Sequence, residues 1–219
     1  MRLAFTYHNE WRNHMRVRFT PAALTALAMS SLASASTWEI DPAHSVAQFS
    51  VRHMMVSNVR GEFGKMSGWV NLDDKDVGHS TTEVTIDTTT ISTREPNRDK
   101  HLKSPDFFDV EKYPTMTFKS TSFKKVGPEK YKVAGDLTLH GVTKPVVLDV
   151  AAPDAVSKLQ GSERRGASAT ATLNRKDFGL VWNKPLESGG VLVGDEVVIT
   201  VDVELVKKAG TAQKAAKTQ

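Results

Sequence analysis

The sequence contains no cysteine among its 219 residues. Disulfide bonds are therefore excluded, and the fold must be stable through its hydrophobic core, which a domain of this length can achieve. Catalysis by a thiol and metal sites built on thiolates are excluded for the same reason.

Long apolar segments are also missing. No internal stretch approaches the roughly 20 consecutive apolar residues that a membrane-spanning helix needs, so the mature protein is not expected to span a membrane. The apolar segment near the N-terminus is shorter than this and has a different signature, described below.

A basic surface is not expected on the folded domain. Residues 1–35 hold four arginines and one glutamate, and four lysines follow Val206, so residues 36–206 carry a net charge of −3. The sequence pI of about 9.2 therefore comes from the two ends of the chain. Net charge gives no support to nucleic-acid binding.

Local catalytic and metal-binding motifs are missing as well. The mature histidines form neither an H-x-H nor an H-E-x-x-H pair, so we predict no metal site and no cofactor. There is no G-x-S-x-G elbow for a nucleophilic serine and no glycine-rich phosphate loop before a helix. No catalytic residue is predicted from these patterns.

The N-terminus has the signature of a signal peptide. Arg16 and Arg18 precede a short apolar run, and the small residues Ala33-Ser34-Ala35 follow it, as at a signal-peptidase site. We expect a signal peptide over residues 1–35, with Met15 as an alternative start. An exported protein without cysteine or a glycosylation sequon is expected in a bacterial periplasm.

The rest of the sequence alternates between apolar and polar residues. This period of two predicts half-buried antiparallel strands, separated by turns rich in Gly, Asp and Pro. The clearest examples are AQFSVRH, EVTIDTTTI, TMTFKS, YKVAGDLTLH and VVITVDVELV. Their spacing of about ten residues favours an all-β sandwich or barrel, and we predict about eight strands that close into a barrel.

Three segments depart from this alternation. We predict a short helical insertion near residues 96–108, with a helix from Pro96 to Lys103 that ends before Ser104-Pro105. The segment GSERRG, residues 161–166, is predicted to be an exposed loop, and residues 208–219 a disordered basic tail. Gly61, Gly64 and Gly68 predict bends in one strand.

Large apolar side chains are numerous for a small antiparallel protein. A closed sheet of about eight strands either fills its interior with them or leaves room for one ligand. Periodicity alone favours the filled interior, because it shows which faces are buried and not whether the middle is open.

Four segments in order make the chain similar to a known family. They are WEIDPAHSVAQFSVRHMMVSNVRGEF, RDKHLKSPDFFDVEKYPTMTFKS, GDLTLHGVTKPV, and RKDFGLVW with VGDEVVITVDVEL. Residues 36–207 thus resemble the YceI-like family of exported, lipocalin-like proteins that bind polyisoprenoids. The resemblance implies an antiparallel lipocalin-like barrel that holds a quinone-type isoprenoid or a similar long amphipathic lipid without catalysis.

The resemblance also suggests which residues contact the ligand. Matching segments contain residues expected to bind it: Phe49, Val51, His53, Phe63, Leu102, Phe107, Phe108, Phe118, Leu137, Leu139 and Phe178. Polar residues expected at the head group or the helical cap are Arg52, Asp99, His101 and His140. Alternatively, Arg98, Asp99 and His101 hold the helix against the barrel by polar contacts, because buried polar groups need partners.

Two other functions remain possible at this point. One is an enzyme that acts on an isoprenoid lipid with His44, His53 or His140 as general base. The other is a stress-related structural module with a filled barrel. A homodimer through a sheet edge or the barrel mouth is left open by the sequence.

Overall fold

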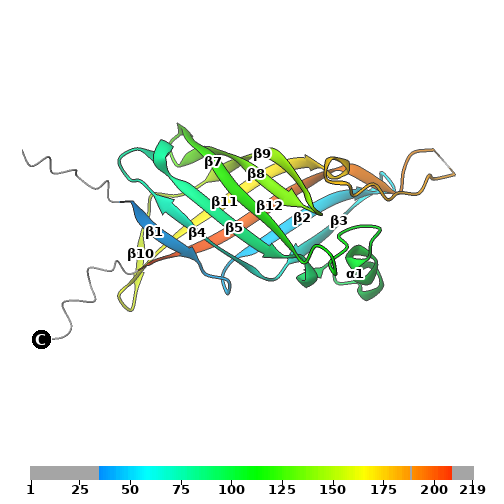
Figure 1. Cartoon of the computed structure of the whole chain (residues 1–219), viewed down its shortest axis with the longest axis horizontal. Coiled ribbons are helices and arrows are strands. Elements are labelled where there is room, and N and C mark those ends of the chain that lie inside the picture. Colours follow the sequence, from blue (N-terminus) through cyan, green and yellow to red (C-terminus); the bar gives the residue numbers. More distant parts are fainter. Residues whose placement is uncertain (1–34, 188, 209–219) are drawn as a thin grey trace, which may run out of the picture. The chain divides into compact units, whose positions relative to one another are not determined.

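The computed structural model describes residues 35–187 and 189–208 (Figure 1). The predicted signal peptide and most of the basic tail therefore lie outside the described residues. The strands are β1 (Ser36–Ile40), β2 (Val46–His53), β3 (Ser57–Phe63), β4 (Met66–Leu72), β5 (Thr81–Asp87), β6 (Ile91–Ser92), β7 (Thr115–Gly127), β8 (Lys130–Leu139), β9 (Val142–Ala151), β10 (Ser157–Leu159), β11 (Ser162–Asn174) and β12 (Val193–Lys207). The helices are α1 (Pro96–Lys103) and the short 3-10 turns η1 (Val77–His79), η2 (Thr88–Thr90) and η3 (Arg175–Phe178).

The strands form one closed antiparallel sheet. The ring runs β11-β9-β8-β7-β5-β4-β1-β12 and closes where β12 pairs with β11 from Asn174↔Glu196 to Arg164↔Val206. The other edge of β12 is shared: β1 pairs with its last residues, and β2 pairs with Val193–Asp202. The predicted barrel of about eight antiparallel strands is therefore confirmed.

The twelve strands reduce to eight because three long strands are interrupted and the short β10 pairs with β11 outside the ring. β1 and β2 follow one another along the same edge of β12, separated by residues 41–45. β3 and β4 are separated at Gly64-Lys65, and β5 and β6 by η2. The break at Gly64 lies within the glycine-marked bend that the sequence predicts.

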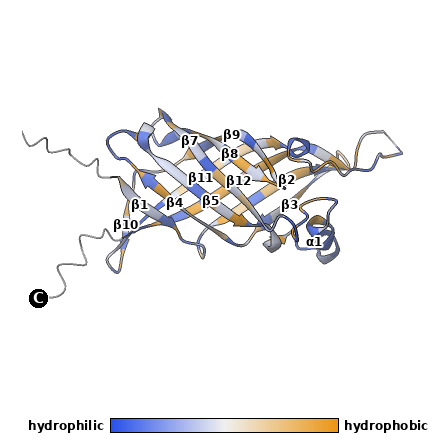
Figure 2. Ribbon diagram, viewed as in Figure 1, coloured by the Kyte–Doolittle hydropathy of each residue, from blue (hydrophilic) through white to orange (hydrophobic). Residues whose placement is uncertain are grey.

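Alternation along each strand directs one set of side chains to the lumen. On β11 these are Arg165, Ala167, Ala169 and Leu173, while Thr170 is exposed on the outer face. In Figure 2, apolar orange residues are interspersed with white and blue ones along the barrel strands, whereas α1 is mainly hydrophilic. The core consists of residues around this lumen, including Trp38, Phe118 and Phe178.

One predicted loop is wrong. In GSERRG, only Gly161 belongs to a turn, with φ of 82°, and Ser162 begins β11. Arg164 and Arg165 pair with Val206 and Leu205 of β12. The charges suggested a loop, but a barrel strand can carry charged residues where it reaches the rim of the sheet.

The helix α1 has the bounds that the sequence predicts. The Glu95 side chain accepts hydrogen bonds from the backbone N–H groups of Asn97 and Arg98, which caps the helix start, and Pro96 occupies the first turn. At the other end, the Ser104 N–H donates to the His101 carbonyl. Among the described residues, no helix is both long and apolar enough to cross a membrane.

Candidate ligand cavity

The barrel encloses a cavity of about 330 Å³. This lies at the small end of the range of ligand sites in proteins. Strands from all sides of the barrel line it, together with the segment that follows α1. Ten residues predicted to bind ligand line the cavity: Phe49, Val51, Phe63, Leu102, Phe107, Phe108, Phe118, Leu137, Leu139 and Phe178. Their contact with a ligand remains a prediction.

Two glycines in the barrel wall make room for aromatic rings. A Cβ atom at Gly135 on β8 would lie 2.5 Å from Phe118 Cζ, and one at Gly61 on β3 would collide with the ring of Phe49. Each ring therefore lies against glycine backbone. Rings held against the wall occupy less of the lumen than rings that point to its centre, so these glycines help to keep the cavity open.

One end of the barrel is covered by α1 and the turns after it. Phe107 and Phe108 follow the helix, and their backbone N–H groups donate to the carbonyls of Ser104 and Leu102. Phe108 contacts Phe63 of the barrel wall, with ring centroids 5.5 Å apart. The cap therefore contributes apolar side chains directly to the lumen.

A second segment, residues 179–187 and 189–192, meets the cap through aromatic contacts. Trp182 lies 4.8 Å from the His101 ring and 5.2 Å from the Phe107 ring, centroid to centroid. His101 also shares a hydrogen bond of 2.8 Å with Asp106. We call His101, Phe107 and Trp182 the aromatic clasp, because they join the two segments at this end of the barrel.

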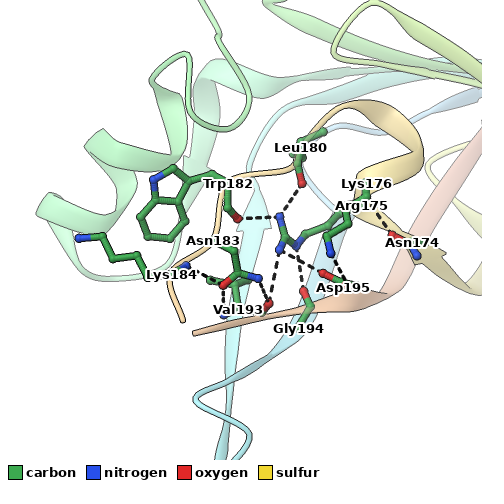
Figure 3. A network of polar contacts seen from close by, with 10 residues as sticks. All are labelled: Asn174, Arg175, Lys176, Leu180, Trp182, Asn183, Lys184, Val193, Gly194 and Asp195. Carbon is green, nitrogen blue, oxygen red and sulfur yellow. Dashed lines mark hydrogen bonds and ion pairs between the residues drawn. The ribbon is translucent and has the colours of Figure 1, made fainter. Parts of the chain in front are cut away.

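This second segment is held by a buried arginine (Figure 3). Arg175 of η3 donates hydrogen bonds to the carbonyl oxygens of four residues and to the Asp195 carboxylate. The carbonyls belong to Leu180, Trp182, Val193 and Gly194. Only 5% of its side chain is exposed. Burial lowers the pKa of Arg175, and the charge of Asp195 opposes this effect. All the N–H directions of this guanidinium thus have acceptors.

The five predicted polar or histidine contacts do not line the cavity. His53 is half-buried at the end of β2, and Arg52 donates to the Met55 carbonyl and to Asn58 in the following turn and strand. His140 lies in the β8–β9 turn, where Tyr113 contacts its ring.

Asp99 and Arg98 attach the helix to Thr93, the residue that follows β6. The Asp99 carboxylate accepts hydrogen bonds from the backbone N–H and the hydroxyl of Thr93, and Arg98 donates to the Thr93 hydroxyl and carbonyl. These contacts match the alternative in which polar residues hold the cap. His101 contributes through the aromatic clasp.

One group of potential metal ligands converges from distant parts of the chain. Oxygen or nitrogen atoms of Asp41, His44 and Glu204 lie within 4.8 Å of one another. Arg164 donates to both carboxylates and so offsets part of their negative charge. Hydrogen bonds from His44, the Ala43 N–H and Arg164 lower the pKa of Asp41 from 3.8 to about 2. The arrangement is that of an ion-pair network.

Sequence reasoning missed the two arginines of the lumen, Arg165 and Arg175. Both line the cavity at positions on or directly after β11. The alternation Arg165, Ala167, Ala169, Ala171, Leu173 would have placed Arg165 on the inner face, but the surrounding charges suggested a loop. Arg175 follows the last strand residue, and nothing local in the sequence marks its burial.

Comparison with known proteins identifies the family. A family model described as the YceI-like domain matches residues 38–205. A UPF0312 protein of Vibrio parahaemolyticus is 38% identical over 162 residues, which are 73% of this chain and 86% of the relative. The chain belongs to the YceI-like family.

Solved structures share the YceI-like barrel. The YceI protein of Campylobacter jejuni is 31% identical, with a TM-score of 0.59 over 72% of this chain and 90% of its own. A polyisoprenoid binding domain from Saccharophagus degradans has a TM-score of 0.57 over 78% of this chain and 98% of its own. At 14% identity, the second comparison shows the fold alone.

Proposed function

We propose that this YceI-like protein binds a polyisoprenoid or a similar long amphipathic lipid in the barrel lumen. The observation that carries the proposal is the cavity of about 330 Å³ whose wall is formed almost entirely by aliphatic and aromatic side chains. The binding of polyisoprenoid by the structurally similar Saccharophagus domain supports the same ligand class.

The physical basis is the transfer of an apolar chain from water. Each buried CH₂ group contributes about 0.8 kcal/mol, so a chain of several such groups gains affinity without specific polar contacts. Walls formed by paired strands need little ordering when the ligand binds. The closed hydrogen-bond ring from β11 to β12 supplies such a wall.

A carrier role without catalysis fits the chemistry of the wall. None of the candidate general bases His44, His53 and His140 lines the cavity formed by the described residues. His44 pairs with Asp41 at an exposed site instead. A filled structural barrel is less well supported, because the lumen retains a cavity. We place the carrier in the periplasm on the basis of the predicted signal peptide, and a quinone-type tail is one member of the proposed ligand class.

The test is to identify what the purified protein contains. The protein is expressed with its leader, purified from the periplasmic fraction without detergent, and extracted with organic solvent for mass spectrometry. We expect a long-chain lipid in near-stoichiometric amount. Well-folded protein that yields no lipid and takes up no isoprenoid quinone would contradict the proposal.

A matched pair of variants locates the ligand in the lumen. Ala169 faces the cavity from β11, whereas its neighbour Thr170 is exposed outside. Ala169→Trp should reduce the bound lipid several-fold by filling the lumen, while Thr170→Trp adds the same ring to the outer surface and should leave it unchanged. Circular dichroism checks that both variants keep the sheet. Equal lipid content in the two variants would place the ligand elsewhere.

A further inference from the structure

Arg165 is a charged side chain that faces the otherwise apolar lumen. It lies on the inner face of β11, paired with Leu205 of β12, and lines the cavity. Its Cζ atom is 4.9 Å from the ring centroid of Trp38, which is itself buried. About 22% of its side chain is exposed. The apolar wall therefore places a cation in contact with the cavity.

The hydrogen-bonding groups of Arg165 are unused. Its Nε is buried and has no hydrogen-bond partner, and no hydrogen bond among the described residues involves its guanidinium. The nearest carboxylate oxygen is Asp74 Oδ1, 3.7 Å from an Nη, which is too long for a hydrogen bond. Arg175, the other arginine of the lumen, has an acceptor for every N–H direction. A buried donor without an acceptor is costly, so a ligand acceptor here would be favourable.

Contact with Trp38 leaves the donors of Arg165 available. A cation near an aromatic ring is attracted by the π-system of the ring, and this attraction does not use up the N–H donors of a guanidinium. Free N–H donors of a guanidinium match the two oxygens of a carboxylate or a phosphate. The position is thus suited to an oxyanion that arrives from the lumen.

The other charges at this end are largely paired with one another. Lys207 lies 5.6 Å from the Trp38 ring and donates to Glu163, which also pairs with Lys158. Asp154 lines the cavity from an exposed position at the rim. Of the acidic residues that the structure describes, only Asp74 is within ion-pair distance of Arg165, and its side chain is 58% exposed.

Arg165 and the aromatic clasp lie at opposite ends of the barrel. Arg175, which holds the segment that carries Trp182, lies ten residues after Arg165, directly beyond the end of β11. Ten residues of an extended strand span about 33 Å. Figure 1 shows α1 and β10, the hairpin partner of the Arg165 end of β11, at the two ends of the barrel. A ligand that reaches Arg165 would therefore extend its chain toward the α1 cap.

We infer that Arg165 binds the anionic head group, a carboxylate or phosphate, of the amphiphile whose apolar chain occupies the lumen. The inference rests on the proposed function and specifies its ligand. It also assigns the head group to the end of the barrel away from Arg52, Asp99, His101 and His140.

The test compares ligands that share one chain and differ in head group. Farnesol, farnesoic acid and farnesyl phosphate are titrated into lipid-free protein by calorimetry, with inorganic phosphate as a fourth probe. Wild-type protein should bind the acid or the phosphate ester more tightly than farnesol. Arg165→Gln should weaken binding of the anionic ligand about ten- to hundredfold and change farnesol less than about twofold.

Two further variants complete the test. Arg60→Gln removes an exposed arginine of β3 that does not line the cavity, so it controls for the change in net charge and should have no effect. Asp74→Asn removes the carboxylate that competes for Arg165 at an exposed position, where folding is least affected. It should strengthen binding of the anionic ligand about two- to fivefold and leave farnesol unchanged.

The outcomes separate the inference from the proposed function. If farnesol binds as tightly as both anionic ligands and neither Arg165→Gln nor Asp74→Asn changes their affinity, the inference is overturned and lipid binding stands. If none of the three farnesyl ligands binds, both the inference and the proposed function are refuted. If inorganic phosphate binds as tightly as farnesyl phosphate, the site is not one for an amphiphile. Should Arg165→Gln fail to fold, an unchanged affinity in Asp74→Asn is sufficient to overturn the inference.

Discussion

Removing the guanidinium of Arg175 should detach the segment that carries Trp182 from the barrel. In Arg175→Met, four carbonyl groups lose the hydrogen bonds that the guanidinium donates, those of Leu180, Trp182, Val193 and Gly194. The lost donor is buried, because only 5% of the Arg175 side chain is exposed. Removing one partner of a buried ion pair lowers the free energy of unfolding by about 3–5 kcal/mol. We expect the lower end, about 3 kcal/mol, because Asp195 keeps its ion pair with Lys176 and the Val193 carbonyl keeps its hydrogen bond from Asn183.

The control removes the other cation of the same carboxylate. Lys176 contacts Asp195 at 2.8 Å, but 44% of its side chain is exposed, so Lys176→Met should cost at most about 1 kcal/mol. Urea denaturation gives the free energy of unfolding of both variants. Hydrogen exchange should show faster exchange of the amides of residues 180–184, 186, 187 and 189–192 in Arg175→Met alone. If Arg175→Met destabilises the protein no more than Lys176→Met, the network does not hold this segment.

Two further predictions concern the barrel wall and its ion pairs. Gly135→Ala should lower the free energy of unfolding by about 1–3 kcal/mol, because the new Cβ meets Phe118 Cζ at 2.5 Å. Gly127→Ala, whose Cβ would have no neighbour closer than 3.8 Å, should change it by less than about 0.5 kcal/mol, and equal effects in urea denaturation would refute the packing argument. For Asp41, the pKa in the folded protein is depressed from 3.8 to about 2, so its stabilising contribution is complete above the ordinary value and is lost as the pH falls through this interval. The difference in unfolding free energy between wild type and Asp41→Asn should therefore shrink between pH 3.8 and about 2, and a difference that stays constant there would contradict the assignment.

Several elements followed directly from local sequence. Alternation with a period of two identified the barrel strands, because each residue on a strand faces either the lumen or the solvent. The bounds of α1 were predictable from Pro96 at its start and Pro105 beyond its end, since proline restricts the backbone on both sides. The ten apolar residues assigned to the lumen were recognised from the family resemblance together with this alternation.

The polar residues of the site were not predictable in the same way. Arg52, Asp99 and His140 looked suited to a head group, but their partners are nearby backbone and side chains. Arg165 was assigned to a loop because charges dominate its surroundings in sequence. Which polar groups find partners depends on segments far apart in the chain, and Arg164 illustrates this by joining Asp41 to Glu204.

The sequence by itself determined the all-β class, the barrel of about eight strands and the family, since these depend on local periodicity and on motifs in order. Only the tertiary structure decided that the lumen keeps a cavity, because ring positions against Gly61 and Gly135 depend on strand register. The tertiary structure also decided which arginine has hydrogen-bond acceptors. Arg175 finds them in the segment that folds around it, whereas Arg165 faces the cavity with its donors unused.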